Sequence, residues 1–137
     1  MKATVLDSYA VITYLQKQPG YEDVAQVFEE CIIKDREAFL CIVNWGEVIY
    51  HALRTGGEER AQLAEDIMRA LPINLVEANR ELTHQAARVK AFHKMSYADC
   101  FVAALAIKNK CELITGDKEF KQVEKEIKIR WINKPSR

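Results

Sequence analysis

Short runs of apolar, strand-forming residues alternate with amphipathic helical segments along the whole chain. Strands are expected at residues 3–6, 38–42, 73–76, 111–115 and 127–132. This alternation favours an α/β fold in which helices cover both faces of a central parallel sheet of about five strands. Right-handed crossovers place every strand-to-helix junction at the carboxyl edge of such a sheet, so residues distant in sequence are expected to meet there.

Caps and helix breakers set the expected helix boundaries. Asn44 and Ser96 are the expected N-caps of helices over 45–53 and 97–108. Gly56-Gly57 is the strongest loop signal, and residues 54–57 are expected to separate two helices. One further helix is expected to end at Pro19, others to cover 21–33, 58–71, 79–94 and 117–126, and residues 134–137 to form a tail.

Length and charge narrow the class of protein. A chain of 137 residues predicts a single domain over 1–137. With 20 basic and 20 acidic side chains the net charge is zero, which argues against a protein that coats nucleic acid electrostatically. An enzyme that touches a few phosphates remains compatible with this balance. No apolar run reaches the roughly 18 residues of a membrane helix, and no secretory signal is recognisable, so no membrane association is expected.

The cysteines give a further indication of the compartment. Cys31, Cys41, Cys100 and Cys111 stand in apolar contexts and form no Cys-x-x-Cys pair. We interpret them as small buried hydrophobic residues rather than as disulfide partners or zinc ligands. Such cysteines are typical of a reducing compartment, and a cytoplasmic location is therefore expected.

Four isolated carboxylates stand at or near the expected strand-to-helix junctions. Asp7 follows the first apolar run directly, and Asp117 follows the fourth. Glu47 and Asp99 lie near the starts of two apolar helices. Because these junctions share one edge of the expected sheet, the four acids are the main functional signal of the sequence.

Each acid also has a purely structural explanation. Asp7 and Asp117 have the placement of N-caps, whose side chains accept a hydrogen bond from a backbone amide two or three residues on. Glu47 and Asp99 follow Asn44 and Ser96 at the spacing of a capping box. Acids in a first helical turn also suit the helix dipole. For any single acid this structural interpretation is the simpler one.

The isolation of the acids favours a metal site for the set as a whole. Asp7 is the only charged residue within 3–16, and Asp99 the only one within 95–107. Burial among apolar residues raises the pKa of a carboxylate, and clustered carboxylates repel one another unless positive charge is near. No arginine or lysine stands at close helical spacing to either residue. An all-oxygen site suits Mg²⁺ or Mn²⁺, and such sites serve phosphoryl transfer.

Four segments of the chain contain these acids. They are Val5-Leu6-Asp7-Ser8-Tyr9-Ala10-Val11-Ile12, Asn44-Trp45-Gly46-Glu47-Val48, Ser96-Tyr97-Ala98-Asp99-Cys100-Phe101-Val102-Ala103-Ala104 with Ala106, and Leu113-Ile114-Thr115-Gly116-Asp117-Lys118-Glu119-Phe120. Together they span nearly the whole chain and resemble the PIN domain family, most closely its VapC-type toxin branch.

The resemblance implies a three-layer α/β/α PIN-like fold and a metal-dependent endoribonuclease, in which metal-activated water cleaves RNA. The implied cofactor is Mg²⁺ or Mn²⁺. Carried over position by position, Asp7 and Asp99 are the principal metal ligands. Glu47 and Asp117 complete the catalytic cluster, directly or through water.

The resemblance also implies partners. Such toxins usually form homodimers, and each is inhibited by a VapB-type antitoxin whose C-terminal segment covers the acidic pocket. Their substrates are RNAs, in several cases tRNA. By the same resemblance the chain is expected to be the toxin of a type II toxin–antitoxin pair.

Several other residues are candidates for roles around the acids. Ser8 and Thr115 match small hydroxyl positions that often orient them. Lys94 and Lys118 flank the expected site and are candidates for contacts with RNA phosphates, although solvated helix faces explain them more simply. The candidates for stacking on a base are Tyr9, Trp45 and Tyr50, although packing in the core or in a dimer is the favoured explanation for each.

Two other classes of function fit less well. A haloacid-dehalogenase-type phosphatase requires a second aspartate two residues after the first, where this chain has Tyr9. A response-receiver domain requires an aspartate after the third strand, where this chain has Glu77. The remaining alternative is a non-catalytic PIN-fold interaction domain or RNA-processing scaffold, but degenerate domains tend to lose acids and this chain keeps all four.

Overall fold

The computed structural model describes residues 3–132, so the tail expected at 134–137 lies outside the described residues. Every expected strand is present: β1 (Thr4–Leu6), β2 (Ala38–Cys41), β3 (Ile73–Val76), β4 (Glu112–Thr115) and β5 (Ile129–Trp131). The helices are α1 (Ser8–Leu15), α2 (Tyr21–Ile33), α3 (Ile42–Ala70), α4 (Arg80–Phe92), α5 (Tyr97–Asn109) and the short 3₁₀ helix η1 (Lys118–Val123). None of these helices is both long and apolar enough to cross a membrane.

The five strands form one parallel sheet in the order β3-β2-β1-β4-β5. β1 lies at its centre, with Leu6 opposite Leu40 of β2 on one side and Ile114 of β4 on the other. The chain builds outward from β1 to β3 and then returns to form β4 and β5 on the other side. The order therefore reverses between β1 and β4. In open α/β sheets, ligands bind at the carboxyl ends of the strands where this reversal occurs.

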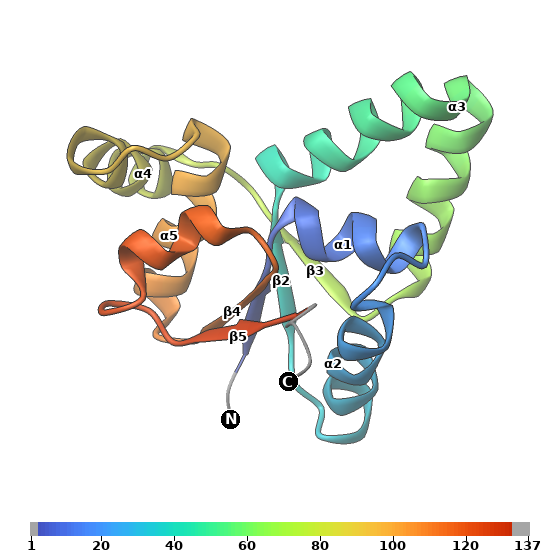
Figure 1. Ribbon diagram of the computed structural model, residues 1–137, viewed down its shortest axis with the longest axis horizontal. Coiled ribbons are helices and arrows are strands. Elements are labelled where there is room, and N and C mark those ends of the chain that lie inside the picture. The colour runs from blue at the N-terminus through green and yellow to red at the C-terminus, as the bar shows by residue number, and fades with distance from the viewer. Residues whose placement is uncertain (1–2, 133–137) are drawn as a thin grey trace.

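Alternate residues of the central strands face opposite sides of the sheet. Val5 and Leu113 belong to the core that packs against α4 and α5, whereas Leu6, Leu40 and Ile114 belong to the core that packs against α1, α2 and α3. All five side chains are fully buried. Figure 1 shows the resulting three layers, with the sheet between the two groups of helices. The predicted α/β/α fold around a five-stranded parallel sheet is confirmed.

Helix α3 differs from its prediction in two ways. It begins at Ile42 with Cys41 at the N-cap, so the prediction that Asn44 is a cap is wrong. The predicted break over 54–57 is also too long, because within α3 the backbone departs from helical geometry only at Gly57, with φ 74° and ψ −164°. Glycine adopts this conformation without the clash that a β-carbon would cause. Two predicted helices therefore form one kinked helix.

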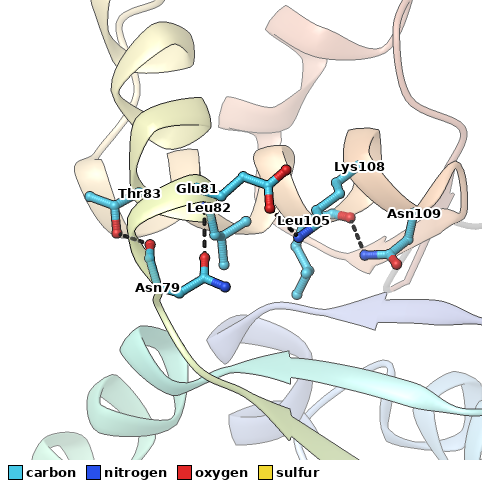
Figure 2. A network of polar contacts seen from close by, with 7 residues as sticks. All are labelled: Asn79, Glu81, Leu82, Thr83, Leu105, Lys108 and Asn109. Atoms are coloured by element: carbon cyan, nitrogen blue, oxygen red, sulfur yellow. Dashed lines mark hydrogen bonds and ion pairs between the residues drawn. The ribbon is translucent and has the colours of Figure 1, made fainter.

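Helices α4 and α5 pack against each other on the face of the sheet opposite α1, α2 and α3. The first turn of α5 contains Asp99, one of the four candidate acids. Asn79 caps α4, because its Oδ1 accepts a hydrogen bond of 2.8 Å from the Leu82 amide (Figure 2). Lys108 Nζ of α5 lies 3.4 Å from Glu81 Oε1 of α4. This ion pair is exposed and contributes little. Buried residues such as Leu82 and Leu105 hold the two helices together.

The cysteines are free thiols, as the sequence predicts. Cys31, Cys41 and Cys100 are buried and Cys111 is half-buried. Burial raises the pKa of each thiol, so all four remain protonated and pack as small apolar groups.

Candidate metal centre

Asp7 stands directly after β1 and is 1% exposed. One of its carboxylate oxygens caps α1 by accepting a 2.8 Å hydrogen bond from the Ala10 amide. Its other oxygen accepts a hydrogen bond from the Thr115 hydroxyl at the end of β4. The capping interpretation of Asp7 is therefore correct, but capping uses only one of its two oxygens.

Thr115 connects the ends of the two central strands. Its hydroxyl donates to Asp7 and accepts a 2.9 Å hydrogen bond from the Asp117 amide. The pairing of β1 with β4 brings the two aspartates to the same edge, since Leu6 and Ile114 are register partners. Thr115 therefore holds Asp7 beside the turn that carries Asp117, as the prediction of an orienting hydroxyl requires.

Asp99 lies in the first turn of α5 and is 8% exposed. Ser96 caps this helix as predicted, and its Oγ accepts a 3.1 Å hydrogen bond from the Asp99 amide. The Ser96 amide, which a capping box would direct to Asp99, instead donates to Glu119 Oε1 at 3.3 Å. The Asp99 carboxylate is thereby left available to face the other acids.

Three acids form the tightest cluster in the part of the chain that the structure describes. Asp99, Asp117 and Glu119 each offer an oxygen, and these oxygens all lie within 4.8 Å of one another. Asp117 also caps η1, because its Oδ1 accepts a 2.9 Å hydrogen bond from the Glu119 amide. This donor set consists of carboxylate oxygens, which suits a hard cation such as Mg²⁺ or Mn²⁺.

Glu119 was not among the acids singled out from the sequence. It stands two residues after Asp117 and one before the fully buried Phe120. Asp117 is the extended N-cap residue before η1 and Glu119 lies in the first turn of η1, so the two acids do not belong to one regular helix and their carboxylates approach each other. The sequence contained a signal for this residue, namely an acid two positions after Asp117 in the segment Thr115-Gly116-Asp117-Lys118-Glu119. The ordinary helix expected from 117 did not predict that these two acids would meet.

Glu47 lies at the same edge but is held by different partners. Ser8 Oγ donates to Glu47 Oε1 at 2.9 Å, and Asn44 Nδ2 donates to the same oxygen at 3.1 Å. Asn44 Nδ2 also donates to the Ala98 carbonyl at 3.3 Å, one residue before Asp99. Asn44 therefore ties the start of α3 to the start of α5, a role that the prediction of a helix cap missed.

The orientation of the Asn44 amide follows from its neighbours. Its nitrogen must face Glu47 and the Ala98 carbonyl, because its oxygen in that place would oppose two acceptors. Its Oδ1 is then buried and has no hydrogen-bond partner among the described residues. A buried oxygen of this kind usually accepts from an ordered water.

Burial and mutual repulsion raise the pKa values of the two most buried acids. Burial raises the pKa of Asp7 to about 7, and Asp117 adds to the rise, while the hydrogen bonds from Thr115 and Ala10 oppose it. The pKa of Asp99 is raised by burial, by a hydrogen bond with the Glu119 carboxyl group and by the charges of Asp117 and Asp7. Among residues 3–132, no lysine, arginine or histidine forms an ion pair with these acids.

The two lysines that were predicted to contact phosphates lie on the surface. Lys94 and Lys118 are both exposed. The backbone amide and carbonyl of Lys94 pair with the side chain of Gln122, each at 3.0 Å, which joins the segment before α5 to η1. Lys118 follows Asp117 directly.

Comparison with known proteins places the chain in a family. A search of the curated proteins found no match. The family model described as the PIN domain matches residues 4–126, which is most of the chain. The chain belongs to the PIN domain family.

Solved structures similar to this PIN domain come from several bacteria. They include VapBC from Salmonella typhimurium bound to DNA (TM-score 0.77, 17% identity, 95% of this chain and 98% of that one). VapBC2 from Rickettsia felis bound to a promoter DNA fragment has a TM-score of 0.76 at 16% identity, with the same coverage. VapC20 from Mycobacterium tuberculosis, described as a sarcin–ricin loop cleaving toxin, has a TM-score of 0.73 at 15% identity and covers 88% of this chain and 95% of that one. At these identities the likeness shows the shared fold.

The Asn44 connection is testable by its effect on stability. Asn44→Leu removes the amide that serves both Glu47 and the Ala98 carbonyl, so we expect a loss of about 1–3 kcal/mol of unfolding free energy in urea titrations. The matched control is Ser8→Ala, which removes the other donor to Glu47 but leaves α3 tied to α5 and should cost less. An Asn44→Leu protein as stable as Ser8→Ala would contradict the connecting role.

The stability of the metal-free protein should fall as the pH rises. The pKa of Asp7 is about 7 in the folded state against an ordinary value of 3.8, so the folded state holds this proton more tightly. The associated stabilisation is complete below the ordinary value and is lost as the pH rises through the folded value. Urea unfolding in EDTA at roughly pH 5 and pH 8 measures this. Asp7→Asn should flatten the dependence, whereas an equal slope in wild-type and Asp7→Asn proteins would contradict the assignment.

Proposed function

We propose that this PIN domain is a Mg²⁺- or Mn²⁺-dependent endoribonuclease and the toxin of a type II toxin–antitoxin pair. The observation that carries the proposal is the cluster of Asp99, Asp117 and Glu119 beside the buried Asp7, with none of these acids ion-paired to a basic side chain among the described residues. Unneutralised carboxylates in this arrangement require either bound protons or a bound cation. The pKa values of Asp7 and Asp99 are raised, which means that both carboxylates favour a bound proton when no cation is present.

The residues present fit a divalent cation, and their contacts suggest distinct roles. Asp99, Asp117 and Glu119 would hold the cation, with Asp7 at their side in the position that Thr115 sets. Glu47 would complete the cluster from α3, in the orientation that Ser8 and Asn44 give it. The bound cation would lower the pKa of an attacking water and stabilise charge on the scissile phosphate.

An RNA substrate is supported by the family and by the character of the site. Among the similar structures, VapC20 is described as cleaving the sarcin–ricin loop. In this chain Lys118 follows Asp117 directly and the backbone of Lys94 pairs with Gln122 of η1, and these two exposed lysines would meet RNA phosphates. Zero net charge agrees with an enzyme that captures its substrate locally. tRNA is one candidate RNA.

The proposed partners follow from the same similarities. Structures similar to this chain include complexes described as VapBC, and we propose a VapB-type antitoxin as the partner of this chain. We further propose a homodimer and a single catalytic domain over residues 1–137. Four free cysteines, three of them buried, support a cytoplasmic location.

A non-catalytic scaffold on the same fold is the competing function. Helix capping alone does not require four acids at the carboxyl edge of the sheet together with Glu119. It also does not require the hydrogen bonds by which Thr115, Ser8 and Asn44 orient these acids. A domain that served only as a scaffold would gain nothing from burying Asp7 with a raised pKa. These observations favour catalysis.

Loss of one central acid should abolish cleavage. Asp99→Asn keeps the side-chain volume but removes a charge that the cation needs, so we expect more than about a 100-fold fall in the rate of Mn²⁺-dependent RNA cleavage, because even the partners of metal ligands are worth about 10- to 100-fold. Asp66→Asn, an exposed acid of α3, is the matched control and should cleave normally. EDTA should stop cleavage by the wild type. Normal cleavage by folded Asp99→Asn protein would refute the catalytic assignment.

A further inference from the structure

The ring of Tyr9 lies against the backbone of Gly116, between Thr115 and Asp117. A β-carbon placed on Gly116 would lie 2.4 Å from Cε1 and 2.9 Å from Cζ of this ring. Gly116 is not among the glycines with positive φ, so its backbone conformation does not itself demand glycine. The Tyr9 ring occupies the space that a side chain at this position would need, so any larger residue there would displace the ring.

Tyr9 is not packed as a core aromatic residue. It is 37% exposed, although its neighbours Asp7 and Ala10 are buried. Within residues 3–132 its phenol oxygen has no hydrogen-bond partner, and its ring pairs with no other aromatic ring. Tyr14, one turn later on the same helix, instead stacks on Tyr21 with ring centroids 5.2 Å apart. The sequence favoured packing in the core or in a dimer for Tyr9, and packing in the core does not account for its position.

Both segments that meet at this ring belong to the candidate site. Tyr9 follows Asp7 and Ser8, and Ser8 donates to Glu47. Gly116 separates Thr115, which donates to Asp7, from Asp117 of the acidic cluster. The ring thus forms a partly exposed aromatic surface at the edge of the carboxylates, fixed in place by contact with their own backbone.

We propose that Tyr9 binds the RNA substrate by stacking on a nucleobase next to the cleaved phosphodiester bond. This inference rests on the proposed ribonuclease function and names one contact of its substrate. Phosphates near the cluster are repelled by the carboxylates until a cation is bound, whereas a base is uncharged and stacks on an aromatic ring without that requirement. Stacking also tolerates every base, so Tyr9 would place a nucleotide without selecting its identity.

The proposal predicts a change in substrate binding rather than in chemistry. Tyr9→Ala should raise the KM for single-stranded RNA by about 5- to 100-fold, the range expected for one lost base stack, with kcat little changed. Tyr9→Phe keeps the ring and should restore the KM. Tyr21→Leu is the matched control, since it removes a tyrosine that stacks within the fold away from the acids, and its KM should equal that of the wild type.

Gly116→Ala provides an independent route to the same effect. The added β-carbon displaces the Tyr9 ring, so the KM should rise as it does in Tyr9→Ala. In the double variant Tyr9→Ala/Gly116→Ala there is no ring to displace, and the KM should equal that of Tyr9→Ala alone, because the two substitutions act on one contact. Thermal unfolding of each variant confirms that the folded enzyme is being compared.

The outcomes separate this inference from the function on which it rests. A wild-type enzyme that cleaves RNA while Tyr9→Ala and Gly116→Ala keep its KM would overturn the stacking role alone. A fall in kcat at constant KM would also overturn it and make the ring a support for the acids. Loss of binding to a VapB-type peptide with unchanged KM for RNA would assign the ring to the antitoxin instead. A wild-type protein that cleaves no RNA in Mn²⁺ would reject the proposed function and this inference together.

Discussion

Crowding of carboxylates at the carboxyl ends of β1 and β4 is the constraint on which the site depends. Burial raises the pKa of Asp7 to about 7 with a further contribution from the charge of Asp117, and the charges of Asp7 and Asp117 in turn add to the raised pKa of Asp99. The Thr115 hydroxyl and the Ala10 amide both donate hydrogen bonds to Asp7, and these bonds offset part of the cost of burying its charge. Burial and repulsion still leave Asp7 partly protonated near neutral pH, so a bound cation would release its remaining proton.

Helix capping and metal binding are compatible roles for the same acids. Asp7 and Asp117 each cap a helix with one oxygen, while Asp7 directs its other oxygen to Thr115. Capping fixes the direction of each carboxylate, and the strand order then decides which carboxylates meet. The site is therefore built from the amino ends of helices whose caps are themselves candidate ligands, and this explains why each acid taken singly looks structural.

The sequence was sufficient to predict the layers and the strands, because apolar periodicity is a local signal. Isolated charges singled out four acids, of which Asp99 and Asp117 belong to the three-acid cluster of the structure. It did not predict the strand order, which depends on how buried faces such as those of Leu6 and Ile114 fit together. Asn44 was taken for a cap because its side chain resembles one, whereas its true partners, Glu47 and the Ala98 carbonyl, include one 54 residues away. Glu119 was missed because an ordinary helix was expected from 117, whereas Asp117 is an extended N-cap followed by the short 3₁₀ helix η1. For Tyr9 the sequence favoured packing in the core or in a dimer, and its contact with Gly116, which is distant in sequence, could be found only in the fold.

The most direct test of this account is a crystal soaked in Mn²⁺, with the ion located by its anomalous scattering. The account predicts a peak in contact with carboxylate oxygens of Asp99, Asp117 and Glu119, which is lost in Asp99→Asn crystals. A wild-type crystal with no peak at the carboxyl ends of β1 and β4, or with Mn²⁺ bound only elsewhere on the surface, would contradict it.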